Sequence, residues 1–328
     1  MKNEYETYEQ ISVVVPCYNE ESALPYFYTE IRKAADSLSA AYKLCFEILF
    51  VDDGSKDHTL ELLRSYAGKD GRIHYISFSR NFGKEAAIYA GFQHSKGDYV
   101  ALMDADLQHP PAMLEAMYLA LKGKEYDIAA AKRISREGEP PIRSFFARRF
   151  YRLINKISEA EFVDGASDFR MLSRRAADAL LKMEEYNRFS KGIFGWLGFR
   201  TKWLPYKNVE RVAGETKWSL GKLFKYSFEG ITAFSTAPLA IAAVMGVVLC
   251  LVALLLALYA IMVFVIGDRA SGWTLLICVI LLVSGIQLLC TGVLAQYLAK
   301  TYWEVKKRPI YIVGETNEDM MWDEKEAN

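Results

Sequence analysis

Two long apolar stretches near the carboxyl end constrain the fold of this 328-residue chain more than any other feature. Residues 237–266 contain no charged side chain, and neither do residues 272–299. A helix needs about 20 apolar residues to cross the hydrocarbon core of a bilayer, so each stretch is long enough to span a membrane. Only a short turn, Gly267–Gly272, joins them, which predicts an antiparallel helical hairpin. The alternative, two buried helices of a soluble core, fits stretches of this length poorly.

Basic residues flank the hairpin on both sides: Lys217, Lys222 and Lys225 before it, and Lys300, Lys306, Lys307 and Arg308 after it. Positive charge collects on the cytoplasmic side of membrane helices, so both flanks are expected in the cytoplasm. The first twelve residues are polar and acidic and lack the apolar centre of a signal peptide. We therefore expect a cell-membrane protein with two spans in residues 233–302, a cytosolic amino-terminal domain (residues 1–232) and a cytosolic tail (residues 303–328).

Charge and cysteine content exclude other classes of protein. The 40 basic and 40 acidic residues balance, whereas a nucleic-acid binder normally carries a basic excess. The five cysteines show no CxxC spacing, so the sequence predicts neither a zinc site nor a disulfide framework.

The amino-terminal part alternates short apolar runs with helical patterns. The runs with strand character are Ile11–Val15, Phe46–Val51, His74–Phe78, Tyr99–Met103 and Asp127–Ala131. The helical patterns between them cover Ser22–Ser39, Asp57–Ala67, Lys84–His94 and Pro111–Leu121. This alternation predicts an α/β domain with a mostly parallel, doubly wound sheet.

Two further segments combine apolar spacing typical of a helix with basic residues. They lie near residues 142–157 and 219–233. Such helices lie on anionic membrane surfaces, although packing against the domain is the alternative. The last fifteen residues, 314–328, hold six acidic side chains against one lysine, which predicts a mobile, solvated tail.

Polar residues follow the expected strands at their carboxyl ends, where ligands bind in open α/β sheets. Asp52 and Asp53 follow the second strand, and Asp104 and Asp106 follow the fourth in the segment DADLQHPP. Two carboxylates one residue apart on an extended loop can approach one cation, with Gln108 completing the shell. Oxygen ligands of this kind favour Mg²⁺ or Mn²⁺ held together with substrate phosphates.

The segments VVVPCYNEE, FVDDGSKDHT, SRNFGKEAA and MDADLQHPP occur in an order and spacing that resemble family-2 glycosyltransferases of the GT-A fold. The resemblance is stronger to the branch that acts on polyprenyl phosphates, similar to dolichol-phosphate mannose synthases and bactoprenol glucosyltransferases. It continues through SDFRMLSRR, NRFSKGIFGWLGF and ETKWSLGKL to the paired apolar stretches, so it covers nearly the whole chain. One departure is Ser167, which stands where the related motif often has glycine before Asp168.

The resemblance implies roles for individual residues. The nucleotide of the donor would contact Pro16, Tyr18 and Glu20, with Asp52 or Asp53 accepting a hydrogen bond from uracil. Ala105 and Gln108 would also bind substrate. Asp104 and Asp106 would hold the donor and its metal, and Asp168 would lie near the reacting sugar. The phosphates would contact Arg133, Arg211 and Lys217. Asp168 would either accept a proton or only orient the sugar.

The resemblance implies transfer of one hexose, with inversion, from a nucleotide sugar to undecaprenyl phosphate at the cytosolic membrane face. UDP-glucose and UDP-N-acetylglucosamine both fit as donors, and the product would serve cell-surface glycan modification. Two alternatives are a processive polysaccharide synthase, which usually has more spans and a QxxRW motif, and a non-catalytic lipid-linked sugar transport or scaffold subunit. Gln287 and Gln296 within the second stretch could join helices between the subunits of a homo-oligomer, and tolerance of polar side chains within one helical pair explains them equally well.

Some residues are not assigned to a site from sequence. The four histidines are scattered, and only His109 adjoins the predicted metal loop. The segment NFGKEAA has Gly83 and Lys84 but lacks the remaining residues of a P-loop, so ATP binding is not predicted.

Overall fold

The computed structural model describes residues 8–134, 149, 151–152, 154–158, 160–206, 231–266 and 273–317. It divides into two compact units. Unit 1 comprises Met1–Asn155, Ala160–Leu220 and Pro309–Asn328, and unit 2 comprises Lys156–Glu159 and Gly221–Arg308. The predicted interfacial helices near 142–157 and 219–233 fall largely outside the described residues, as do Arg211 and Lys217.

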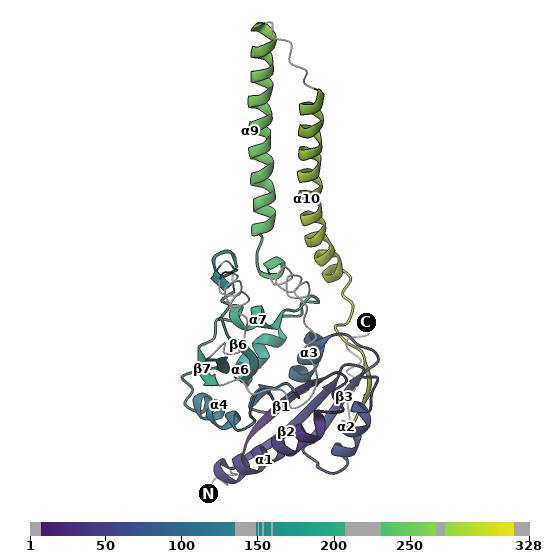
Figure 1. Ribbon diagram of the computed structural model, residues 1–328. Helices are drawn as coiled ribbons and strands as arrows, with labels where there is room; N and C mark the ends of the chain where they lie inside the picture. Colours follow the sequence, from purple (N-terminus) through teal and green to yellow (C-terminus); the bar gives the residue numbers. More distant parts are fainter. Residues whose placement is uncertain are drawn as a thin grey trace. The chain divides into compact units, whose positions relative to one another are not determined.

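Unit 1 is built on one eight-stranded sheet with the order β7-β5-β6-β4-β1-β2-β3-β8 (Figure 1). Its strands are β1 (Glu9–Cys17), β2 (Leu44–Asp52), β3 (Ile73–Phe78), β4 (Tyr99–Leu102), β5 (Ile128–Arg133), β6 (Ala166–Ser173), β7 (Thr201–Tyr206) and β8 (Val313–Thr316). Only β6 and β8 run against the common direction of the others. The predicted mostly parallel α/β fold is therefore confirmed.

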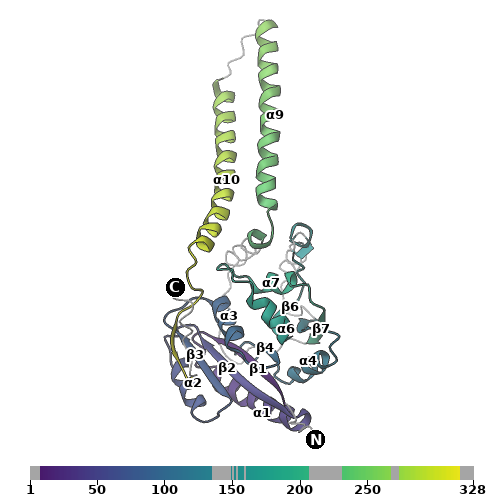
Figure 2. The same ribbon diagram turned by 180° about the vertical axis from the view of Figure 1, so that it is seen from behind.

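Helices cover both faces of this sheet (Figures 1 and 2). They are α1 (Leu24–Tyr42), α2 (Thr59–Ala67), α3 (Lys84–His94), α4 (Met113–Lys122), α6 (Arg174–Leu181) and α7 (Ser190–Trp196). Alternate residues of β2 divide between the faces, as a strand buried on both sides requires. Phe46, Ile48 and Phe50 join the core with α1, α2 and α4, whereas Leu49 and Val51 pack with the alanines of α3.

Helix α3 lies close to the sheet because its buried face carries small residues. A Cβ atom at Gly91 would come within 2.1 Å of the Val14 side chain on β1. Glycine at this point therefore permits the close approach of helix and strand. This approach matters for the site, because α3 begins at Lys84.

The predicted strands and helices of residues 11–131 are all present, with bounds that differ by a few residues. The sequence did not predict β6, α6, α7, β7 or β8. The expected mobile tail is wrong for its first residues, because Val313–Thr316 forms β8 and pairs with β3. The acidic composition of residues 314–328 concealed this strand, whose Glu315 has basic and hydroxyl partners in Arg64 and Tyr75.

Unit 2 contains two long apolar helices, α9 (Ala237–Ile266) and α10 (Trp273–Val305). Both are long and apolar enough to cross a membrane, over Ala237–Leu256 and Leu282–Val305. Helix α10 continues past the predicted end at Ala299, since charged residues at a helix end can lie outside the hydrocarbon core. Within this unit, Lys300 Nζ donates to Thr232 Oγ1 at 2.7 Å.

Candidate active site

The carboxyl ends of three parallel strands bring the predicted site residues to one edge of the sheet. Strand β1 ends at Cys17, which is paired in register with Asp52 at the end of β2. On the other side of β1, Val14 pairs with Leu102, the last residue of β4. The loops that carry Tyr18, Glu20 and Asp53, and the loop with Asp104 and Asp106, therefore start side by side, as the sequence predicts.

Hydrogen bonds join the loop after β1 to the loop after β2. The Asn19 N–H donates to Ser55 Oγ at 2.9 Å, and Asn19 Oδ1 accepts from the Lys56 N–H at 2.9 Å. The Glu20 N–H donates to Thr59 Oγ1 at 2.9 Å. Tyr18 is exposed beside this seam, whereas Pro16 is buried within β1. The two loops therefore form one continuous surface, and the sequence analysis predicts that the nucleotide binds there.

The buried carboxylates of Asp52 and Asp53 are hydrogen-bonded within the protein. Asp52 accepts from the Ser55 N–H at 3.1 Å and from Ser77 Oγ at 2.7 Å. Asp53 accepts from the N–H groups of Phe82 at 2.6 Å and Gly83 at 2.9 Å. Burial nevertheless raises the pKa of Asp53 above its ordinary value. Asp53 thus fixes the loop from Ser79 to Gly83, and its predicted contact with uracil stays a prediction.

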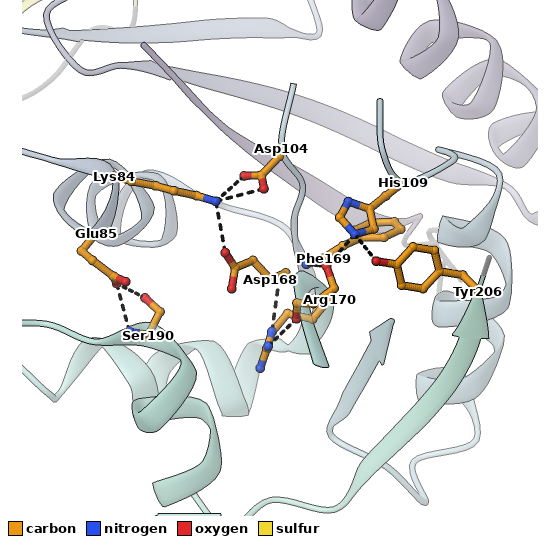
Figure 3. A network of polar contacts seen from close by, with 10 residues as sticks. Lys84, Glu85, Asp104, His109, Asp168, Phe169, Arg170, Ser190 and Tyr206 are labelled. Atoms are coloured by element: carbon orange, nitrogen blue, oxygen red, sulfur yellow. Dashed lines mark hydrogen bonds and ion pairs between the residues drawn. The ribbon is translucent and has the colours of Figure 1, made fainter. Parts of the chain in front are cut away.

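We call the loop after β4 that carries Asp104 and Asp106 the DxD loop. Lys84 joins it to strand β6 (Figure 3). Its Nζ lies 2.7 Å from Asp104 Oδ1 and 3.1 Å from Asp168 Oδ2. Desolvation would lower the pKa of Lys84, but the two carboxylates raise it above its ordinary value. The structure therefore brings Asp104 and Asp168, which the sequence proposed separately, together around one cation that the sequence did not assign.

The carboxyl group of Asp168 stays ionised in this environment. Desolvation would raise its pKa, but the positive charges of Lys84, Lys191 and Arg170 outweigh desolvation and lower it below the ordinary value. A carboxylate with a lowered pKa is a weak proton acceptor near neutral pH. The arrangement thus favours an electrostatic or orienting task for Asp168.

Arg170 holds the backbone on which Asp168 sits. Its guanidinium donates to the carbonyl oxygens of Ser167 at 2.6 Å and Asp168 at 3.3 Å. The same group lies 3.7 Å from the ring centre of Phe194 on α7. Burial lowers the pKa of Arg170 to about 10, so the side chain remains a cation at neutral pH.

His109 connects the DxD loop to β6 and β7. Its Nε2 lies 2.6 Å from Ser167 Oγ. The same atom lies 3.0 Å from the Tyr206 hydroxyl (Figure 3). Burial lowers the pKa of His109, which favours the neutral ring. Ser167 also accepts from the Phe169 N–H at 3.1 Å. The serine that departs from the related motif thus supplies a hydroxyl to this contact.

The DxD residues fit a divalent ion that shares substrate phosphates. Asp104 and Asp106 follow β4 on one short loop, where Asp106 Oδ1 accepts from the Gln108 N–H at 3.1 Å and Ala105 is buried. Across the described ranges, no group of three or more His, Cys, Asp or Glu is placed to hold an ion. Mg²⁺ is usually bound by one or two carboxylates together with substrate phosphates, and this donor set agrees with that pattern.

Of the three predicted phosphate contacts, Arg133 is the one that lies within the described residues. Arg133 ends β5, and its N–H donates to the Gly165 carbonyl at 2.9 Å. Sequence reasoning missed Lys84, Arg170 and the pair formed by Glu85 and Ser190, and it noted His109 only as a neighbour of the predicted metal loop. Glu85 accepts from the Ser190 N–H at 3.0 Å, which joins the start of α7 to the start of α3. Lys84 and Arg170 lie in the segments SRNFGKEAA and SDFRMLSRR, which carry the family resemblance. Sequence spacing alone could not predict that residues so far apart in the chain meet in one site.

Comparisons with known proteins identify the family of the chain. Residues 12–181 match the family described as Glycosyl transferase family 2. The Bacillus subtilis (strain 168) protein CsbB is 42% identical over 313 residues, which cover 94% of this chain and 92% of CsbB. The prophage bactoprenol glucosyl transferase homolog of Escherichia coli (strain K12) is 39% identical over 309 residues, covering 93% of this chain and 98% of that protein.

Among solved structures, mannosyl-3-phosphoglycerate synthase from Rubrobacter xylanophilus matches with a TM-score of 0.46 and 19% identity, over 69% of this chain and 72% of that one. The family match spans more than half of the chain, and the sequence relatives match along nearly all of it. The chain belongs to glycosyl transferase family 2 and is a glycosyltransferase.

Proposed function

We propose that the protein transfers one hexose from a nucleotide sugar to a polyprenyl phosphate at the cytosolic membrane face. The observation that carries this proposal is the position of Lys84 between Asp104 and Asp168, at the carboxyl ends of the parallel strands. Relatives named bactoprenol glucosyl transferase, at 37% identity over 94% of the chain, support a polyprenyl-linked acceptor. UDP-glucose or UDP-N-acetylglucosamine is the proposed donor.

The charges in the site suit a reaction between two phosphate groups. In the proposed step, an acceptor phosphate oxygen forms a bond to the anomeric carbon, and the bond from that carbon to the diphosphate oxygen breaks with its electron pair. A phosphate monoester has a second pKa of about 6, so the acceptor is largely ionised near neutral pH and attacks without a general base. Lys84 would stabilise the charge that develops on the departing nucleoside diphosphate.

Asp104, Asp106 and Gln108 would hold Mg²⁺ or Mn²⁺, which supplies further positive charge for the diphosphate when bound. Asp168, with its lowered pKa, would face the positive charge that develops at the anomeric carbon and orient the sugar. A single in-line displacement inverts the anomeric configuration, so an α-linked donor would give a β-linked lipid phosphate.

The two apolar helices support a membrane location for the reaction. A long polyprenyl chain leaves a bilayer at a cost of about 0.8 kcal/mol per CH₂ exposed, so the enzyme must bring its site to the lipid. Helices α9 and α10 are each long enough to anchor it there as two spans. We further propose that the protein forms a homo-oligomer and that its product supplies lipid-linked sugar for the modification of cell-surface glycans.

A donor screen tests the proposed function. Purified protein in detergent receives undecaprenyl phosphate and Mg²⁺ with UDP-glucose, UDP-N-acetylglucosamine, UDP-galactose or GDP-mannose, and mass spectrometry follows the lipid. One donor should give a lipid with a single sugar, and Asp106→Ala should abolish the product. Asp36→Ala, which removes an exposed carboxylate bound to Arg72 on the opposite side of the sheet from α3, is the matched control. A polymer, or no lipid-linked sugar from any donor, would contradict the proposal.

A further inference from the structure

The carboxyl-terminal strand closes an edge of the catalytic sheet. Strand β8 pairs antiparallel with β3, with Ile76 opposite Thr316 and Phe78 opposite Val313. An unpaired edge strand presents a row of backbone N–H and C=O groups to other chains. We call residues 310–317 the strap, because this segment runs along β3 and reaches the loop that follows it.

Side-chain hydrogen bonds fix the carboxyl-terminal end of the strap. Glu315 accepts from the Arg64 guanidinium at 2.7 Å and from the Tyr75 hydroxyl at 2.7 Å. Asn317 Oδ1 accepts from the Tyr75 N–H at 2.7 Å, and its Nδ2 donates to the Ile73 carbonyl at 3.2 Å. The pKa of Glu315 falls to about 2, chiefly through the hydrogen bond from Arg64. This end of the strap is therefore held by several specific contacts.

The amino-terminal end of the strap packs on α3. The Tyr311 ring stacks on Phe78 with centres 4.9 Å apart, and its hydroxyl lies 2.8 Å from His94 Nε2 and 2.9 Å from Gln93 Oε1. Ile310, Tyr311 and Val313 also pack against the apolar cluster that contains Ala86, Ala87 and Ala90 of α3. The strap thus packs against α3, the helix whose first residue is Lys84.

The strap also contacts the loop between β3 and α3. The Ser79 N–H donates to the Ile312 carbonyl at 3.0 Å. A Cβ atom at Gly314 would come within 3.2 Å of the Ser79 backbone, so the two segments lie in close contact. The other end of this loop is held by Asp53, through the N–H groups of Phe82 and Gly83. The strap and Asp53 therefore hold opposite ends of one loop, which leads directly into Lys84.

We infer that the strap is a positioning element of the active site, which fixes the loop Ser79–Gly83 and helix α3 so that Lys84 reaches Asp104 and Asp168. The inference rests on the proposed function for its effect on turnover, but not for its effect on the loop. It gives the end of the chain a catalytic purpose beyond membrane anchoring. Along the chain, the strap follows α10, which ends at Val305.

Two truncations test the inference in the full detergent-solubilised protein. A chain that ends at Asn317 keeps every described contact of the strap and should retain the kcat of the wild type. A chain that ends at Arg308 lacks the strap, and its kcat should fall by about tenfold to a hundredfold, since a displacement of about 1 Å can cost as much. A synthetic peptide with the sequence of residues 309–317 should restore part of the lost activity. Wild-type kcat in a folded chain that ends at Arg308 would overturn the inference.

Amide hydrogen exchange separates positioning from the proposed function, because it needs no substrate. Loss of the strap should accelerate exchange of the Phe82 and Gly83 amides, while the loop after β1 stays protected. If the wild type transfers no sugar from any donor, the proposed function fails, and the exchange result still decides this inference. Unchanged exchange at Phe82 and Gly83 would overturn it.

A point variant decides the question if the chain that ends at Arg308 does not fold. Gly314→Val should push the strap away from Ser79 and reproduce the faster exchange and lower kcat. Gly123→Val is the matched control, because a Cβ atom there meets nothing within 4 Å. Equal behaviour of the two glycine variants would contradict the inference.

Discussion

Replacement of Lys84 by methionine should reduce turnover severely while leaving the fold intact. Lys84 supplies the one positive charge within 3.1 Å of both Asp104 and Asp168 among the described residues. Two unit charges about 3 Å apart interact by roughly 5–6 kcal/mol at an effective dielectric of about 20. The Lys84 side chain is 47% exposed, so solvent screening reduces that value substantially.

The loss expected in catalysis is therefore that of one active-site electrostatic contact, about 2.7–4 kcal/mol, or a fall in kcat of about 100- to 1000-fold. Lys84→Arg keeps the charge on a longer side chain and should lie between the wild type and Lys84→Met. The assay is steady-state transfer to undecaprenyl phosphate by purified protein, with thermal unfolding as a check on the fold.

Lys69→Met is the matched control. It removes the same charge, but from an exposed residue that follows α2. It should leave kcat within about twofold of the wild type. If Lys84→Met were to keep kcat within about threefold of the wild type, the assignment of Lys84 to leaving-group stabilisation would be refuted.

Three further results are expected. Asp168→Asn should lower kcat without moving the acidic limb of the pH profile of kcat/KM between about pH 5 and 7, because the pKa of Asp168 is already below this window; a moved limb would indicate a general base. Glu315→Gln should lower Tm by about 2 °C or less at neutral pH. The hydrogen bond from Arg64 lowers the pKa of Glu315 from 4.5 to about 2. The stability advantage of the wild type over Glu315→Gln is therefore full above about pH 4.5 and disappears as the pH falls towards 2. A difference in Tm that stays constant across this pH range would contradict the assignment. Gly54→Ala should destabilise unit 1 by about 1–3 kcal/mol in chemical denaturation, since Gly54 has a φ of 66° and a Cβ atom would come within 2.5 Å of the Arg80 backbone; an unchanged midpoint would argue against that backbone conformation.

The part of the fold that follows from local pattern was predictable. Apolar runs gave β1 to β5, and the bounds predicted for α3, Lys84–His94, are those observed. Strand β6 was missed because it carries Asp168 and Arg170. Charged residues of this kind interrupt the apolar run that would mark a strand inside a sheet. Its antiparallel position between β4 and β5 depends on pairing across the chain, which no short window contains.

The candidate site was predictable in its carboxylates and not in its cations. Asp104 and Asp106 carry a recognisable spacing at a strand end, and Asp168 lies in a segment that resembles the family. Lys84 lies 20 residues before Asp104 and 84 before Asp168, so only the folded chain brings its ammonium to both. The strap escaped prediction for a similar reason, because the partner of Glu315 is Arg64, 251 residues away.

The most direct test of the central claim compares two acceptors that differ only in the phosphate. Purified protein receives the donor identified in the screen together with undecaprenyl phosphate or with undecaprenol, and the rate of sugar incorporation into the lipid phase is measured for each. The proposed mechanism predicts transfer to undecaprenyl phosphate and none to the alcohol, because in this mechanism the ionised phosphate oxygen is the nucleophile and no general base deprotonates the acceptor. Comparable rates with both acceptors would contradict it.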